Sequence, residues 1–257
     1  MRLHPKLFSL FSPAPVKYQL DSRVEAEALG ISSVMESNPQ RMTAMGHDQV
    51  ARLNQIHRDN PGEAEFMGMA IYSEPPLEAA EIQPYGRPQK GRTCLFSMAG
   101  ELPGIEDGER FPLGDQWPLS CTDQERAFCL LQERVRKLWS EGWPDMEMRL
   151  ALISDYAGRL RRLGEHNFLH WDGEMLFAHR GLEEEPLAFL ELSGSVELQS
   201  EQLKLSFTAE SDLNFVVVGS TSLLPATAIE IEPGTTCCFR NGQLQESCEP
   251  VIFWENS

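Results

Sequence analysis

The chain has 257 residues, enough to bury a full core, and carries a formal net charge of −17, with 39 Asp and Glu against 22 Lys and Arg. This acidic balance repels phosphate backbones and anionic lipids, so we expect neither nucleic acid nor membrane partners. No apolar run is long enough to cross a bilayer, and the apolar patch at 7–11 is too short for a signal peptide. We therefore expect a cytoplasmic protein with a single domain over residues 1–257.

The first half of the chain predicts short strands and helices in alternation. "KLFSLFS" at 6–12 predicts a strand ending at a proline-marked turn, and helices are expected at 23–36 and 47–58 with the polar "SNPQRMTAMG" between them. The apolar "FMGMAIY" at 66–72 and "TCLFSMAG" at 93–100 predict two further strands. A proline-rich loop separates these two strands, and a segment rich in turn formers follows the second.

The second half begins with two helices and continues as short strands. Phe128, Leu131 and Val135 recur at the spacing of a helix over 123–139, and a second helix is expected at 147–163. The strands that follow are "HNFLHWD", "EMLFAHR", "PLAFLEL", "QLKLSF", "NFVVVGS", "TTCCFR" and "PVIFWE". "WDGEM" and "RNGQL" carry the signals of tight hairpins. This order predicts an α+β fold in which helices cover one outer face of two stacked antiparallel sheets.

Several segments together resemble the class II glutamine amidotransferase family. "KLFSLFSPAPV" resembles the strand after that family's leading cysteine, and "EFMGMAIY" stands where the family has an Asp-Gly-Trp-Gly strand. "FSMAG" at 96–100 matches the ends of a Phe-Ala-His-Asn-Gly turn, and "TDQERAF" at 122–128 matches a Thr-Asp-Ser-Glu helix start. "HNFLHWDGEMLFAHRG" and "FVVVGSTSLL" are similar to its later paired strands. The resemblance implies a four-layer αββα sandwich of the N-terminal-nucleophile hydrolase type.

Three departures from the family pattern remove the chemistry that the resemblance would imply. The family nucleophile is a leading cysteine with a free amine, but Pro5 or a near neighbour stands there and no cysteine precedes Cys94. Ala99 replaces the turn asparagine of the oxyanion hole, although Gly100 could still offer its N–H. The segment with a His-x-Arg motif, whose arginine grips the substrate carboxylate, should lie between Tyr72 and Pro84, where no arginine occurs.

One family position is retained. Asp123 matches the aspartate that holds the substrate ammonium group. A structural interpretation competes with this one, because Thr122 followed by Glu125 predicts a capping box and an acidic first turn suits the helix dipole. We favour the cap, since the other substrate anchors are missing, and glutamine binding is therefore doubtful.

Other constellations of polar residues predict no cofactor and no metal. His166, His170, His179 and Asp172 lie on one expected hairpin, but ordinary strand positions explain them as well as a metal site does. Adjacent cysteines at 237 and 238 would face opposite sides of a strand. The six cysteines lack CxxC spacing and are expected to be reduced and mostly buried.

The sequence therefore favours a catalytically inactive amidotransferase-like protein that binds or scaffolds a protein partner, or a second copy of itself. The first alternative is an active amidotransferase or γ-glutamyl amide hydrolase with an unrecognised nucleophile such as Ser9, Cys94 or Cys121. The second alternative is a sensor that only binds a glutamine-like ligand, against which the missing arginine argues.

Overall fold

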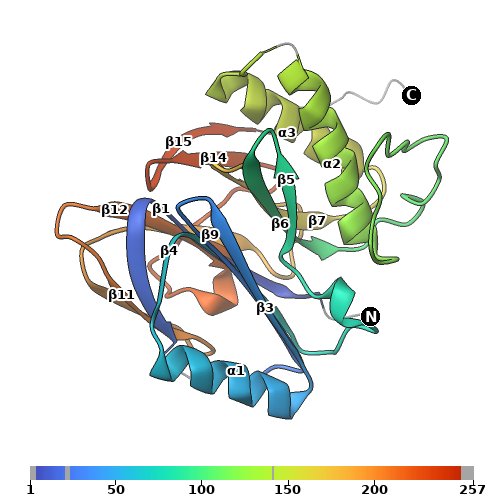
Figure 1. Cartoon of the computed structure of the whole chain (residues 1–257). Coiled ribbons are helices and arrows are strands. Elements are labelled where there is room, and N and C mark those ends of the chain that lie inside the picture. The colour runs from blue at the N-terminus through green and yellow to red at the C-terminus, as the bar shows by residue number, and fades with distance from the viewer. Residues whose placement is uncertain (1–3, 21–23, 141, 250–257) are drawn as a thin grey trace.

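Two antiparallel sheets stack face to face in the computed structural model, which describes residues 4–20, 24–140 and 142–249 (Figure 1). Sheet A has the spatial order β13-β9-β12-β1-β4-β2-β3, and β11 joins β10 to β1. Its members are β1 (Lys6–Leu20), β2 (Ala28–Met35), β3 (Asn38–Met45), β4 (Gly62–Tyr72), β9 (Leu187–Ser193), β10 (Val196–Gln199), β11 (Lys204–Thr208), β12 (Asn214–Ser220) and β13 (Ile229–Glu230).

Sheet B has the spatial order β15-β14-β8-β7-β6-β5. Its strands are β5 (Tyr85–Gln89), β6 (Arg92–Gly100), β7 (His166–Trp171), β8 (Leu176–His179), β14 (Thr236–Arg240) and β15 (Gln243–Cys248). The outermost strands of the two sheets include β3 and β5, so each of these has one edge without a neighbouring strand in its sheet.

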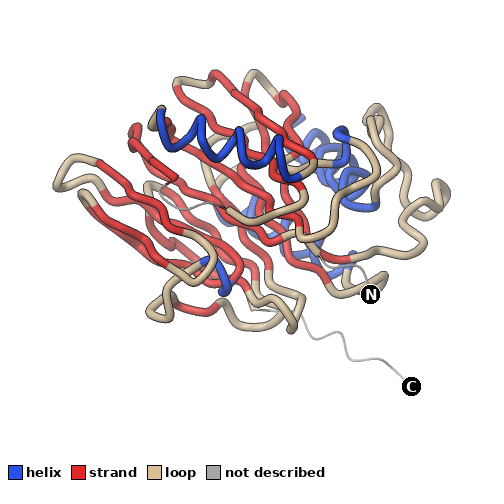
Figure 2. Tube along the Cα trace, turned by 90° about the horizontal axis from the view of Figure 1, so that it is seen from below, coloured by secondary structure: helices blue, strands red, loops and turns tan. Residues whose placement is uncertain are grey.

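Helices cover both outer faces of the stacked sheets (Figures 1 and 2). α1 (His47–Asp59) packs on sheet A, while α2 (Asp123–Ser140) and α3 (Met146–Leu160) pack on sheet B. Two short 3-10 turns, η1 (Ala79–Glu81) and η2 (Thr221–Leu223), lie in loops. Among the described residues, none of the helices has the length and apolar character that a membrane crossing requires.

Three apolar clusters separate the four layers. The first, which includes Phe8 and Leu53, lies between sheet A and α1. The second, with Phe66 and Trp171 stacked at 4.9 Å, lies between the sheets. The third lies between sheet B and its helices, where Phe96 stacks on Phe128 at 5.2 Å. Both faces of the central strands are therefore buried against apolar side chains. The four-layer α+β sandwich predicted from the sequence is confirmed.

Most of the predicted elements are present. The helices expected at 47–58, 123–139 and 147–163 are α1, α2 and α3, and the strands expected at 66–72 and 93–100 lie within β4 and β6. The two predicted hairpins join β7 to β8 and β14 to β15, the second through Asn241 and Gly242 with φ of 55° and 73°. The "PVIFWE" segment lies outside the described residues.

Predictions near the N-terminus were wrong in three places. The helix expected over 23–36 is the strand β2, and the polar segment after it is β3. β2 is buried between β3 and β4 with both faces covered, so sheet pairing overrides its local pattern. The first strand also continues to Leu20, because a register shift between Phe11 and Val16 accommodates the prolines there.

A further error concerns the proline-rich loop, which contains β5. Pro88 is compatible with this strand because β5 lies at the edge of sheet B, where an N–H is not needed on the open side.

Candidate functional site

The resemblance predicts the candidate site at the end of β6, where Gly100 lies beside His4 just before β1. His4 precedes β1 and lies half-buried, and its Nδ1 accepts a hydrogen bond from the Gly100 backbone N–H at 3.2 Å. The N–H expected to be free for an oxyanion is therefore occupied by a side chain of the same protein. An accepting Nδ1 must be unprotonated, which fixes the imidazole tautomer in this contact.

The opposite side of Gly100 is also occupied. Its carbonyl oxygen accepts a hydrogen bond from Gln124 Nε2 at 2.6 Å. Both backbone polar groups of this glycine are thus satisfied inside the protein, without a ligand.

Ala99 faces the core between the two sheets and is 1% exposed. It pairs in register with Asn167 of β7, the nearest cross-strand amide side chain. The Asn167 carbonyl oxygen accepts from the backbone N–H groups of Gly181 and Leu182, and its amide nitrogen donates to the Glu185 carbonyl oxygen at 2.7 Å. Asn167 therefore uses its amide oxygen and one of its two amide N–H donors within the protein.

Asp123 occupies the first turn of α2 and uses its carboxylate within the protein. Its Oδ2 accepts a hydrogen bond from the Leu102 backbone N–H at 3.0 Å, which ties the loop after β6 to the helix. This contact supports the structural interpretation of Asp123.

The predicted capping box forms only in part. Thr122 Oγ1 accepts from the Glu125 backbone N–H at 3.2 Å, as an N-cap should. The Glu125 carboxylate instead accepts from the backbone N–H groups of Leu119 and Ser120 and from Arg87. Burial alone would raise the pKa of Glu125, but these hydrogen bonds outweigh it and hold the pKa below its usual value. Glu125 thus organises the loop before α2.

Most of the residues considered as alternative nucleophiles are buried. Pro5 is buried and has no nucleophilic group. Ser9 is 2% exposed within β1. Cys94 is fully buried, and burial raises the pKa of its thiol to about 12. Cys121 is the exposed member of the set, in the loop before α2.

A further buried side chain, Gln83, lies beside the candidate site and was missed from the sequence. Its Nε2 donates to the Met98 carbonyl oxygen at 3.0 Å, and its Oε1 accepts from the Met98 N–H at 2.5 Å. The Gln83 amide thus fixes β6 two residues before Gly100. Neither Gln83 nor His4 carries a local sequence signal, because their contacts join residues 15 and 96 positions apart.

The histidines of the β7–β8 hairpin come together only in part, because the His166 and His179 ring centroids lie 5.2 Å apart whereas His170 packs against Phe96 and Phe128. His170 Nδ1 contacts the Leu95 carbonyl oxygen at 3.1 Å, whereas His179 Nδ1 contacts Thr236 Oγ1 at 2.9 Å. Burial lowers the pKa of His166 to about 4 and lowers the pKa of His170 and His179 as well. Within the described ranges, no group of three or more His, Cys, Asp or Glu side chains is placed to hold a metal ion.

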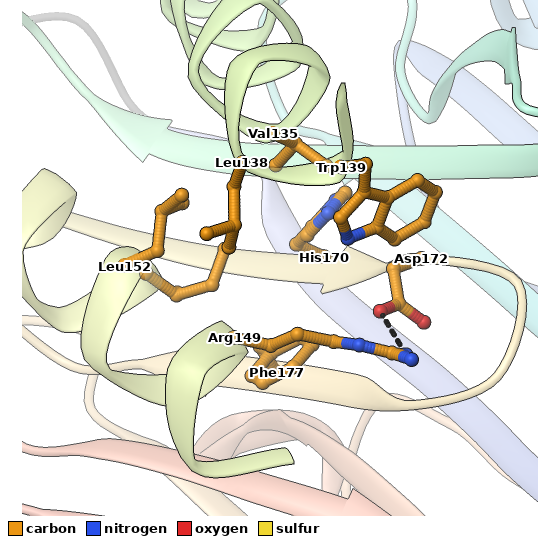
Figure 3. Close-up of a pocket in the computed structure, with 9 residues that line it drawn as sticks. Val135, Leu138, Trp139, Arg149, Leu152, His170, Asp172 and Phe177 are labelled. Carbon is orange, nitrogen blue, oxygen red and sulfur yellow. Dashed lines mark hydrogen bonds and ion pairs between the residues drawn. The ribbon is translucent and has the colours of Figure 1, made fainter. Parts of the chain in front are cut away.

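Asp172 belongs to an ion pair and not to the histidines. Its Oδ2 lies 3.0 Å from Arg149 Nη1, and both side chains are about 95% buried beneath α3 (Figure 3). His170 lies beside them under Trp139, at the wall of a small cavity of about 10 Å³. This cavity offers space on the scale of one water molecule.

Comparisons with known proteins identify the architecture. The model of the family described as glutamine amidotransferases class-II matches residues 73–256. A putative glutamine amidotransferase of Escherichia coli, YafJ, is 26% identical over 137 residues, which are 52% of this chain and 51% of that protein. An uncharacterized protein of Methanocaldococcus jannaschii is 29% identical over 176 residues, 63% of this chain and 45% of that protein. The chain thus spans about half the length of these curated relatives.

Solved structures share the fold at low sequence identity. A predicted glutamine amidotransferase from Pseudomonas aeruginosa superposes with a TM-score of 0.72 at 19% identity, covering 94% of this chain and 99% of that one. The allosteric regulatory enzyme of purine biosynthesis gives a TM-score of 0.62 at 12% identity, covering 96% of this chain and 49% of that one.

Proposed function

The chain belongs to the class II glutamine amidotransferase family, and on this premise we propose that it is a catalytically inactive member that acts as a binding or scaffolding subunit. The observation that carries the proposal is the hydrogen bond from the Gly100 N–H to His4 Nδ1, beside Ala99. An oxyanion hole works by presenting free donors to developing negative charge. Here the Gly100 N–H is hydrogen-bonded to His4, and Ala99 has a methyl group where the family pattern has a side-chain donor.

The missing nucleophile supports the same proposal. No cysteine occurs among residues 1–93, and Pro5 stands at the start of β1. Covalent catalysis by this family requires an activated thiolate, so the remaining groups have no intermediate to stabilise. No arginine lies between Tyr72 and Pro84 to bind a substrate carboxylate.

We further propose that the protein works in the cytoplasm as one domain with a protein partner or a second copy of itself. All six cysteines are free, which suits a reducing compartment. Exposed apolar side chains at Leu77, Trp117 and Leu119, which are 75–85% exposed, offer contact area for a partner.

Purification from the native host under its own promoter tests the scaffolding role. We expect a complex of fixed stoichiometry by light scattering after size exclusion, either with one co-purifying protein or as a defined oligomer. Replacing Trp117 and Leu119 with Ser should weaken that complex, while the matched replacement of Ile56 on α1 should not. A monomer without a partner, together with measurable glutamine turnover, would contradict the proposal.

A further inference from the structure

A cleft opens on the side of the sandwich where the two sheets end in β3 and β5. Its volume is about 390 Å³, and its walls come from β2 and β3 of sheet A and from β5 and β6 of sheet B. Clefts of this size commonly hold small organic molecules. We call it the edge cleft and define it by Ser32, Pro39, Arg41, Arg87, Pro88 and Leu95.

The edge cleft is cationic in a strongly acidic protein. The lining contains two arginines and no Asp or Glu, although the chain carries a net charge of −17. Arg87 is already paired with Glu125 at 2.9 Å. Arg41 donates through Nη2 to the Ile82 carbonyl oxygen, and among the described residues no carboxylate pairs with it. One guanidinium charge is therefore left uncompensated at the mouth of the cleft.

Ser32 supplies the second, independent observation. It is 2% exposed at the floor of the cleft, and its hydroxyl has no hydrogen-bond partner. A buried hydroxyl without a partner destabilises the folded protein. An alanine would fit the same strand position without that cost, so the hydroxyl is better explained by a ligand than by the fold.

We propose that the edge cleft binds a small organic monocarboxylate with an apolar body. The carboxylate contacts the free donors of Arg41, and Ser32 rotates about χ1 to donate to it. The apolar body lies against Leu95, Pro39 and Pro88. A monoanion fits better than a phosphate dianion, because Arg87 is committed to Glu125 and only one guanidinium charge is available.

This site is separate from the former active site and does not depend on whether that site is idle. None of the residues that line the edge cleft is His4, Ala99, Gly100 or Asp123, the positions of the former active site. Loss of ligand binding at the edge cleft and loss of glutamine chemistry would therefore be measured independently.

Titration of the full-length protein with benzoate and with benzamide, followed by amide NMR shifts, tests the proposal. The two probes share one shape and differ in charge. We expect benzoate to shift residues of the edge cleft and to bind at least about tenfold more tightly than benzamide, because a charge-assisted bond is lost in the amide. Arg41→Gln should remove this preference, while Arg52→Gln on α1, with the same loss of charge, should retain it.

Ser32→Ala keeps the test decisive if Arg41→Gln fails to fold. Without ligand, this variant should melt at a higher temperature, since an unsatisfied hydroxyl is removed, and it should bind benzoate several-fold more weakly. Equal binding of benzoate and benzamide, no binding of either, or tighter binding of phenyl phosphate would overturn the proposal. Unchanged benzoate affinity in Ser32→Ala would overturn the role of that hydroxyl.

Discussion

Gly100 is required by the fold, independently of any chemistry. Its φ of +125° is rarely adopted by residues with a side chain, and an added Cβ would lie 2.5 Å from the Glu165 carbonyl oxygen. The glycine that completes an oxyanion hole in the family pattern is thus retained here by packing against β7. A residue that matches a catalytic motif can be explained by sterics alone.

Replacing Gly100 with alanine should destabilise the protein by roughly 2–4 kcal/mol, because backbone strain and a backbone clash add. Chemical denaturation measures the change. Gly104→Ala is the matched control: its φ is +89°, but a Cβ there meets nothing within 4 Å. It should cost only about 1 kcal/mol. Equal losses in the two variants would show that the contact with Glu165 is unimportant.

The buried histidines should make stability depend on pH. The pKa of His166 is about 4 in the folded protein, below the 6.5 of an exposed histidine, so the unfolded chain binds more protons between these values. The contribution of His166 to the free energy of unfolding is therefore fully present above pH 6.5, and it is lost as the pH falls toward 4. From pH 7.5 to 5, His166 alone should contribute a loss of about 2 kcal/mol.

Denaturation curves at pH 7.5 and 5 for wild type and His166→Gln measure this contribution. The variant should be less stable at pH 7.5 but should lose about 2 kcal/mol less than wild type on acidification. Identical pH dependence in wild type and His166→Gln would refute the assignment.

At the scale of elements, α3 is anchored to the β7–β8 hairpin by a buried ion pair. Arg149 contacts Asp172 at 3.0 Å (Figure 3). It also contacts Glu174 at 3.1 Å, and its guanidinium lies 5.2 Å from the Trp143 ring. Replacing Arg149 with Met should cost about 3–5 kcal/mol, because Asp172 would remain as a buried charge without its partner.

The control for this prediction is an exposed pair on the same helix. Arg159 contacts Asp155 at 2.9 Å with its side chain 63% exposed. Arg159→Met should cost less than about 1 kcal/mol in urea denaturation, since water screens the pair. Comparable losses for the two variants would mean that burial does not set the strength of the Arg149 contact.

The same scale shows what sequence patterns can and cannot predict. α2 was predictable because Phe128, Leu131 and Val135 mark one face and Thr122 caps it. β2 was not predictable from its own sequence, because it forms a strand only by pairing with β3 and β4. Ala99 and Gly100 were found through the motif, but His4 could not be, since only folding brings it to Gly100.

For the whole molecule, the distribution of thiols predicts a sharp division in reactivity. Cys94, Cys129, Cys237 and Cys238 are buried, and burial raises their pKa values to between about 11 and about 12. Cys121 is exposed and Cys248 is partly exposed. Maleimide labelling followed by mass spectrometry should modify these two without denaturant and the other four only after unfolding. Rapid modification of Cys94 in the folded protein would contradict this.

Release of ammonia from glutamine by the purified protein is the most direct test of the proposal that the chain is a catalytically inactive amidotransferase. We expect no turnover above background in wild type, in Ala99→Asn or in Asp123→Ala. An added asparagine donor has no oxyanion to stabilise without a nucleophile, and Asp123 serves the loop at Leu102. Turnover by wild type that disappears in Asp123→Ala would contradict the account, because Asp123 would then be a substrate ligand in a working active site.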